Sequence, residues 1–196
     1  SWLSTHRPDI VLVILESFTG HILDMPEVMP RLKALSEEGI YFPHFYANSF
    51  RTDRGLVSIL SGYPAQPTAS IMKSPSKSQS LPAIARSLRK VGYDTEMIYG
   101  GDADFTNMRS YFYATGYGRV MSCDDFTTEE NSARWGVPDH ITFPRVEKEI
   151  ARQTARPFMK TFLTLSSHEP FDVPMSRLEH PYLNSVAYTD SCLGAF

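Results

Sequence analysis

Apolar and polar positions along this chain form blocks that predict strands and helices in turn. Residues 9–15 hold an almost unbroken run of β-branched and aliphatic residues, which is typical of a strand buried on both faces of a parallel sheet. Three further stretches rich in β-branched and aromatic residues predict strands at residues 40–47, 95–99 and 158–165.

Between these stretches, apolar residues recur at three- and four-residue spacing, which predicts helices. Pro30, Leu32 and Leu35 indicate one helix, which Gly39 ends. Ser80 is placed to cap a second helix, whose apolar face is Leu81, Ile84, Ala85 and Leu88 and which Gly92 closes. Further helices are predicted at residues 52–60, 105–113, 143–150 and 182–196. Residues 62–80 are expected to form an exposed loop, and residues 114–140 to be irregular.

The alternation of strands and helices favours an α/β/α layered fold with a mainly parallel central sheet. A length of 196 residues suits one domain or most of one. The sequence stops inside a predicted helix, so we expect residues 1–196 to be the N-terminal larger part of a single domain.

Charge and composition exclude several classes of protein. Lysine and arginine number 19 against 22 acidic residues, and no basic stripe is present, so a nucleic-acid partner is not expected. The longest aliphatic run is far shorter than the ~20 residues of a membrane helix, so we expect this stretch itself to be soluble. Cys123 and Cys192 allow at most one disulfide, and the sequence leaves open whether they pair.

Ligands of open α/β sheets gather at the carboxyl ends of the strands, so polar residues there are candidates for chemistry. Glu16 follows the first predicted strand, where it either binds a metal or is a solvated or capping carboxylate. Thr52 begins a predicted helix, where backbone N–H groups favour an anion. A threonine activated by a metal is a competent nucleophile, and the alternative is an ordinary N-cap.

Two more polar clusters follow predicted strands. Asp102, Asn107 and Arg109 follow the strand at residues 95–99, and Arg109 is either a phosphate ligand or a surface arginine after a polar turn. His168 follows the strand at residues 158–165 and either contacts an anionic oxygen or is structural. The Asp139-His140 pair does not end a clear strand, so turn and capping duty is favoured for it over metal binding.

Five ordered motifs now carry a resemblance to a known family. They are Ile-Leu-Glu16-Ser17, Ser-Phe-Arg-Thr52-Asp-Arg-Gly, Tyr-Gly-Gly-Asp102-x-x-Phe-x-Asn107-Met-Arg109, Trp135-Gly-Val-x-Asp139 and Ser-Ser-His168-Glu-Pro-Phe. Together they resemble the lipoteichoic acid synthase-type phosphoglycerol transferases of the sulfatase and alkaline phosphatase superfamily.

The resemblance implies an alkaline phosphatase-like fold and a divalent metal, typically Mn²⁺, with Mg²⁺ or Zn²⁺ as alternatives. It implies that Glu16 and Thr52 bind this metal, that Thr52 is the nucleophile, and that Asp102, Asn107, Arg109 and His168 hold the substrate. The partners it implies are a phospholipid head group and a hydroxyl acceptor. It also implies a membrane-anchored parent protein that works on the outer face of the bacterial cytoplasmic membrane.

Departures from the family pattern limit what the resemblance implies. A well-known member of the family has a histidine near Gly100 and a tryptophan near Asn107, and this chain differs at both places. The remaining metal ligands of the family are an Asp-His pair on a later strand, which we expect to lie beyond Phe196. Sulfatases need cysteine or serine where Thr52 stands, so sulfate-ester chemistry is disfavoured. The alternatives are a phosphoethanolamine transferase, a phosphodiesterase, or a non-catalytic binding domain of the same fold.

Overall fold

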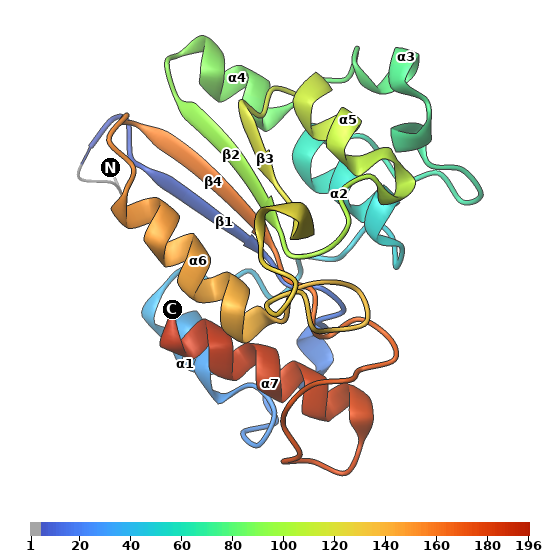
Figure 1. The fold of residues 1–196 in the computed structure, drawn as a ribbon, viewed down its shortest axis with the longest axis vertical. Helices are drawn as coiled ribbons and strands as arrows, with labels where there is room; N and C mark the ends of the chain where they lie inside the picture. The colour runs from blue at the N-terminus through green and yellow to red at the C-terminus, as the bar shows by residue number, and fades with distance from the viewer. Residues whose placement is uncertain (1–4) are drawn as a thin grey trace.

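The computed structural model describes residues 5–196, and its centre is a four-stranded sheet (Figure 1). The strands are β1 (Ile10–Ile14), β2 (Asp94–Tyr99), β3 (Arg119–Met121) and β4 (Phe158–Leu163). Their spatial order is β1-β4-β2-β3, and each neighbouring pair is parallel. The predicted α/β fold with a parallel sheet is therefore confirmed.

Helices cover both faces of this sheet, as parallel strands with helical crossovers require. On one face lie α2 (Thr52–Ser61), α3 (Pro75–Ser78), α4 (Ile84–Lys90) and α5 (Met108–Ala114). The helices of the other face are α1 (Pro30–Glu38), α6 (Asp139–Ala151) and α7 (Pro181–Ala195) (Figure 1).

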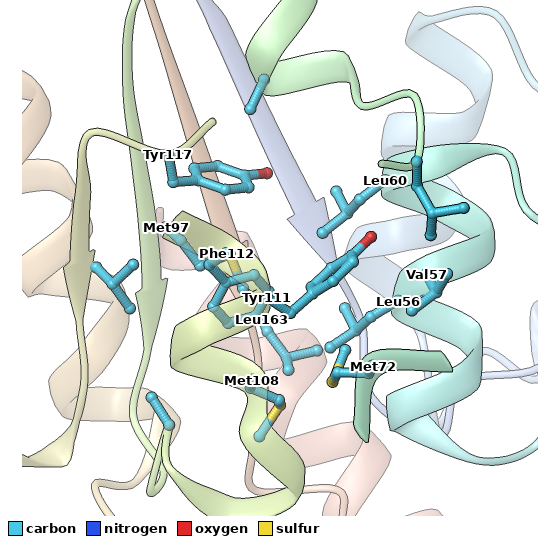
Figure 2. Packing of buried hydrophobic residues seen from close by; sticks show 14 residues of the cluster. Leu56, Val57, Leu60, Met72, Met97, Met108, Tyr111, Phe112, Tyr117 and Leu163 are labelled. Atoms are coloured by element: carbon cyan, nitrogen blue, oxygen red, sulfur yellow. The ribbon is translucent and has the colours of Figure 1, made fainter. Parts of the chain in front are cut away.

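Successive residues of β2 and β4 point to opposite faces and so supply two hydrophobic cores. Met97 and Leu163 belong to the larger core, where α2 and α5 face each other beside the sheet (Figure 2). Ile98 and Phe162 belong to the second core, which includes Phe143 of α6. These cores fix the distance between the sheet and the helices that carry the candidate residues.

The strand predicted at residues 40–47 is wrong. This segment has no regular structure, and Phe42, Phe45 and Tyr46 are 67%, 81% and 77% exposed. Its aromatic residues favour extended backbone, but a strand also needs a neighbour to hydrogen-bond with. Among residues 5–196, the only strand paired with β1 is β4, so β1 is a half-buried edge strand and not the fully buried one predicted.

Three smaller predictions also need correction. Residues 114–140 contain the three-residue strand β3, which is too short to give a period-two pattern. The predicted loop at residues 62–80 contains α3 and a 3₁₀ turn at Ile71–Lys73. Helix α4 begins at Ile84 with Ala83 as its N-cap, so Ser80 does not cap it.

A buried ion pair links the two central strands. Glu96 of β2 and Lys160 of β4 are cross-strand neighbours, and Lys160 Nζ lies 2.5 Å from Glu96 Oε2. Both side chains are at most 4% exposed, and Arg119 Nη1 lies 3.1 Å from the other oxygen of Glu96. A buried charge is tolerated only when it is paired, so each member of the pair depends on the other.

We predict that Glu96→Ala lowers the free energy of unfolding by about 3–5 kcal/mol, because it leaves the buried Lys160 ammonium without a carboxylate partner. Lys160→Ala should lower it by a smaller amount, because Arg119 still pairs with Glu96. The double variant Glu96→Met/Lys160→Met should lie close to the wild type, because no charge remains buried there. Urea unfolding monitored by circular dichroism measures both effects. A loss under about 1 kcal/mol in Glu96→Ala would contradict the dependence.

Candidate active site

The polar residues predicted to act together lie at the carboxyl-end edge of the sheet. Glu16 follows β1, Tyr99 ends β2, and residues 164–169 follow β4. Because β1, β4 and β2 are adjacent and parallel, the three segments emerge side by side. Thr52 reaches this edge as the first residue of α2.

Glu16 and Thr52 are in direct contact across 36 residues of sequence. Thr52 Oγ1 donates towards the Glu16 carboxylate, at 3.3 Å from Oε1 and 3.2 Å from Oε2. The next residue, Ser17, has a φ of 58°, a left-handed conformation that is strained for a residue other than glycine. The sharp turn after β1 therefore holds the Glu16 carboxylate against the N-terminus of α2.

The environment of Glu16 disfavours its charged form. Burial raises the pKa of Glu16 above its ordinary value, while the nearby His168 and the hydrogen bonds from the Thr52 and Ser17 hydroxyls oppose this rise. A cation beside the carboxylate would favour the charged form for the same electrostatic reason.

The segment after β4 is bonded to the main chain of Glu16. Glu16 N–H donates to Thr164 Oγ1 at 2.9 Å, and Ser167 Oγ donates to the Glu16 carbonyl oxygen at 2.5 Å. His168 Nδ1 lies 2.8 Å from the carbonyl oxygen of Glu169. A carbonyl oxygen only accepts, so Nδ1 carries the proton and Nε2 is left to meet a substrate oxygen.

Tyr99 is a site residue that the sequence reasoning did not single out. Burial raises the pKa of its hydroxyl, and the carboxylates of Glu16 and Asp102 add to the rise. Its ring covers Gly101, where an added Cβ would lie 2.4 Å from the ring. The Tyr-Gly-Gly sequence is the pattern that could have indicated this position, because glycine at position 101 leaves room for the Tyr99 ring to lie against the backbone.

The other candidates after β2 are held by protein groups. Arg109 Nε lies 2.9 Å from Asp104 Oδ1, and Arg109 Nη2 lies 2.9 Å from Asp124 Oδ2. Asn107 donates to the Met72 carbonyl oxygen at 2.9 Å, and Asp102 accepts the N–H of Asp104 at 2.8 Å. A phosphate that binds Arg109 must therefore join or displace two carboxylates.

Asp139 is fully buried and is the first residue of α6. The same helix contains Pro144 in its interior. Burial raises the pKa of Asp139, and the N–H groups of Leu165 and Ser166 and the hydroxyl of Thr189 oppose the rise. The sequence favoured a capping role for Asp139, but α6 has no side-chain cap. The Asp139 carboxylate instead accepts hydrogen bonds from the loop after β4.

A cleft of about 910 Å³ opens beside Glu16 and Thr52 and is lined by residues 14–18, residues 45–52 and further residues of α2. Carboxylate and hydroxyl oxygens are donors that hard divalent cations accept, so Glu16 and Thr52 fit part of a metal site. Within residues 5–196, no group of three or more His, Cys, Asp or Glu side chains is arranged to hold a metal.

In the same part of the chain, no helix combines the length and apolar character that crossing a bilayer requires.

Comparisons with known proteins identify the family of the chain. The sequence profile of the sulfatase family matches residues 8–196, so the chain belongs to the sulfatase family. Lipoteichoic acid synthase 2 of Bacillus subtilis is 26% identical over 96% of this chain. The chain spans 32% of the length of that relative.

Solved structures show the same fold. A protein of the alkaline phosphatase superfamily from Vibrio parahaemolyticus has a TM-score of 0.88 and 28% identity over 99% of this chain, which covers 50% of that structure. The lipoteichoic acid synthase LtaP from Listeria monocytogenes has a TM-score of 0.81 at 21% identity, with 96% of this chain and 50% of that one aligned. The family and fold inferred from the five motifs are therefore confirmed.

We predict that Glu16→Gln raises the melting temperature of the metal-free chain at pH 7.5. The raised pKa means that the folded state binds protons more tightly, so stability falls as the pH rises from the unfolded pKa through the folded one. Above that window the charged Glu16 costs stability, and glutamine removes the cost. The gain should vanish at pH 4, where most Glu16 is protonated in both states.

Differential scanning calorimetry in EDTA at the two pH values measures this difference. Glu27→Gln is the matched control, because Glu27 is exposed and should give no pH-dependent gain. A lower melting temperature for Glu16→Gln at pH 7.5 would show that the carboxylate stabilises the metal-free fold.

Proposed function

We propose that this chain is the core of a metal-dependent phosphoester transferase that acts on phospholipid head groups, of the phosphoglycerol transferase type. The observation that carries the proposal is the contact between Thr52 Oγ1 and both carboxylate oxygens of Glu16, at 3.2 and 3.3 Å, in a chain of the sulfatase family. Two oxygen donors at a helix N-terminus suit a reaction in which negative charge gathers on phosphate oxygens.

Thr52 is the proposed nucleophile. Its hydroxyl proton is directed at the Glu16 carboxylate, so the oxygen lone pairs are available for attack once that proton leaves. A divalent cation held by Glu16 and Thr52, Mn²⁺ in the first instance, would lower the hydroxyl pKa and neutralise phosphate charge. Thr52 is the first residue of α2, and a helix N-terminus favours a bound anion such as phosphate.

The reaction takes two displacement steps. Thr52 Oγ1 forms a bond to phosphorus while the bond from phosphorus to the lipid alcohol breaks, and that alcohol leaves with a proton. The product is a phosphothreonine diester. The hydroxyl of an acceptor, or water, then attacks the same phosphorus, and Thr52 recovers its proton as it leaves.

Asp102, Asn107, Arg109 and His168 are the proposed substrate-binding residues. His168 Nε2 is the ring nitrogen that can contact a head-group or phosphate oxygen, because Nδ1 is bonded to Glu169. The Arg109 guanidinium is aligned by Asp104 and Asp124, and its remaining N–H groups can bind a phosphate.

The substrate class and location rest on relatives. The matched proteins include lipoteichoic acid synthases and phosphoglycerol transferases, and a Streptococcus pyogenes phosphoglycerol transferase of the same fold was solved with sn-glycerol-1-phosphate. We therefore propose a glycerol phosphate donor group, a hydroxyl acceptor, and a membrane-anchored parent protein acting on the outer face of the bacterial cytoplasmic membrane. Threonine at position 52 argues against sulfate-ester hydrolysis.

We predict that Thr52→Ala in the full-length protein lowers turnover of a fluorescent phosphatidylglycerol analogue by at least ~10³-fold, because the attacking oxygen is gone. Thr52→Ser keeps a hydroxyl and should retain measurable activity. Thin-layer chromatography of the lipid products measures both, and it also distinguishes transfer from simple hydrolysis. Undiminished turnover in Thr52→Ala, with unchanged circular dichroism, would remove Thr52 from the mechanism.

We predict that the 196-residue chain binds Mn²⁺ weakly, with a dissociation constant above about 1 µM, because its metal site is incomplete. Glu16 and Thr52 supply two donors, and residues 5–196 provide no three-member group of ionisable ligands. Isothermal titration calorimetry measures the affinity, with Glu16→Gln as the control that should abolish the remaining heat. Sub-micromolar binding would show that further ligands lie within this chain.

A further inference from the structure

Besides its bonds to Glu16, the loop that carries His168 is bonded to a second segment, to which the proposed mechanism gives no role. This segment is residues 135–139, which lead into α6 and include its first residue, and Trp135 and Asp139 are the two ends of the segment. Its close approach to β2 requires glycine, because a Cβ on Gly136 (φ 143°) would lie 2.2 Å from the Gly100 carbonyl oxygen. Val137 N–H then donates to that same oxygen at 2.8 Å.

Asp139 makes four hydrogen bonds, three of them to the start of the loop and one to Thr189 of α7. Its carboxylate accepts Leu165 N–H at 2.9 Å, Ser166 N–H at 3.2 Å and the Thr189 hydroxyl at 2.7 Å. Its own N–H donates to Ser166 Oγ at 2.9 Å. Asp139 is fully buried, so these bonds act in a low dielectric where they are strong and directional.

Trp135 binds the other end of the loop. Its indole N–H donates to the Glu169 carbonyl oxygen at 2.6 Å, and this is the same oxygen that accepts His168 Nδ1–H. The Trp135 ring lies edge-on to the imidazole, with centroids 5.2 Å apart. The carbonyl that sets the tautomer of His168 is thus itself oriented by Trp135.

We propose that Trp135 and Asp139 are positioning residues that fix the orientation and the Nδ1–H tautomer of His168. The inference rests on the proposed function only for its effect on turnover, since the tautomer can be observed in the chain as it stands. Asp139 acts through Leu165 and Ser166, and Trp135 acts through Glu169; neither needs to touch the reacting atoms.

The test compares two buried carboxylates that differ in what they bind. Asp190 on α7 is 1% exposed and accepts Arg31 N–H at 3.0 Å and Leu32 N–H at 2.8 Å, at the start of α1. Asp139→Asn and Asp190→Asn each keep the volume and place an NH₂ group against a donor. Both should lower the melting temperature by several degrees, but only Asp139→Asn should disturb His168.

The readout is the ¹⁵N NMR spectrum of the His168 ring in the 196-residue chain at a pH where the ring is neutral, with His168→Gln identifying the signals. The wild type and Asp190→Asn should show the Nδ1–H tautomer. Asp139→Asn and Trp135→Phe should each show a mixture with the Nε2–H tautomer. The Trp135→Phe substitution removes the indole N–H donor and part of the ring. In the full-length protein, kcat for both should fall ~10–100-fold with a smaller change in KM.

Each outcome decides the proposal. Wild-type His168 signals in Asp139→Asn, at the same loss of stability as Asp190→Asn, would overturn it for Asp139 and leave that residue a purely structural one. Should Asp139→Asn fail to fold, Trp135→Phe decides alone, and an unchanged tautomer there overturns the proposal. Because the spectrum does not depend on turnover, a shifted tautomer supports the positioning role even if Thr52→Ala stays active.

Discussion

The parallel alignment of β1, β4 and β2 is the constraint on which the candidate site depends. It brings three strand ends to one edge, where Glu16, the His168 loop and the Tyr99-Gly100-Gly101 turn become neighbours despite separations of more than 60 residues. The buried Glu96–Lys160 ion pair joins β2 and β4 within the sheet. The register of the sheet therefore sets the geometry of the site.

Two kinds of contact hold these neighbouring segments in place: hydrogen bonds between strand ends and close backbone approaches at glycine. Short bonds from Thr164 and Ser167 to the main chain of Glu16 tie the ends of β1 and β4 together. Glycines 100 and 136 allow the segment at residues 135–139 to approach the end of β2, because a Cβ on either would collide with the other segment. The carboxylate of Glu16 is then left partly desolvated beside the Thr52 hydroxyl, a state that favours binding a cation.

The fold and part of the site follow from local signals in the sequence. Strands β1, β2 and β4 and helices α1, α2 and α7 coincide with strong apolar runs or helical spacing bounded by proline and glycine. Residue type and position after a strand also singled out Glu16 and His168, and position at the start of a helix singled out Thr52. The aromatic segment at residues 40–47 had the composition of a strand but lacked a partner to pair with.

The sequence by itself determined which elements form and which polar residues stand at their ends, since these depend on side-chain periodicity within a few positions. Only the tertiary structure decided which residues meet. It joined Thr52 to Glu16, directed the Asp139 carboxylate to the loop after β4 instead of to its own helix, and placed Arg109 between two carboxylates. Those contacts depend on strand order and on close approaches at glycine, which are long-range properties of packing that no local pattern encodes.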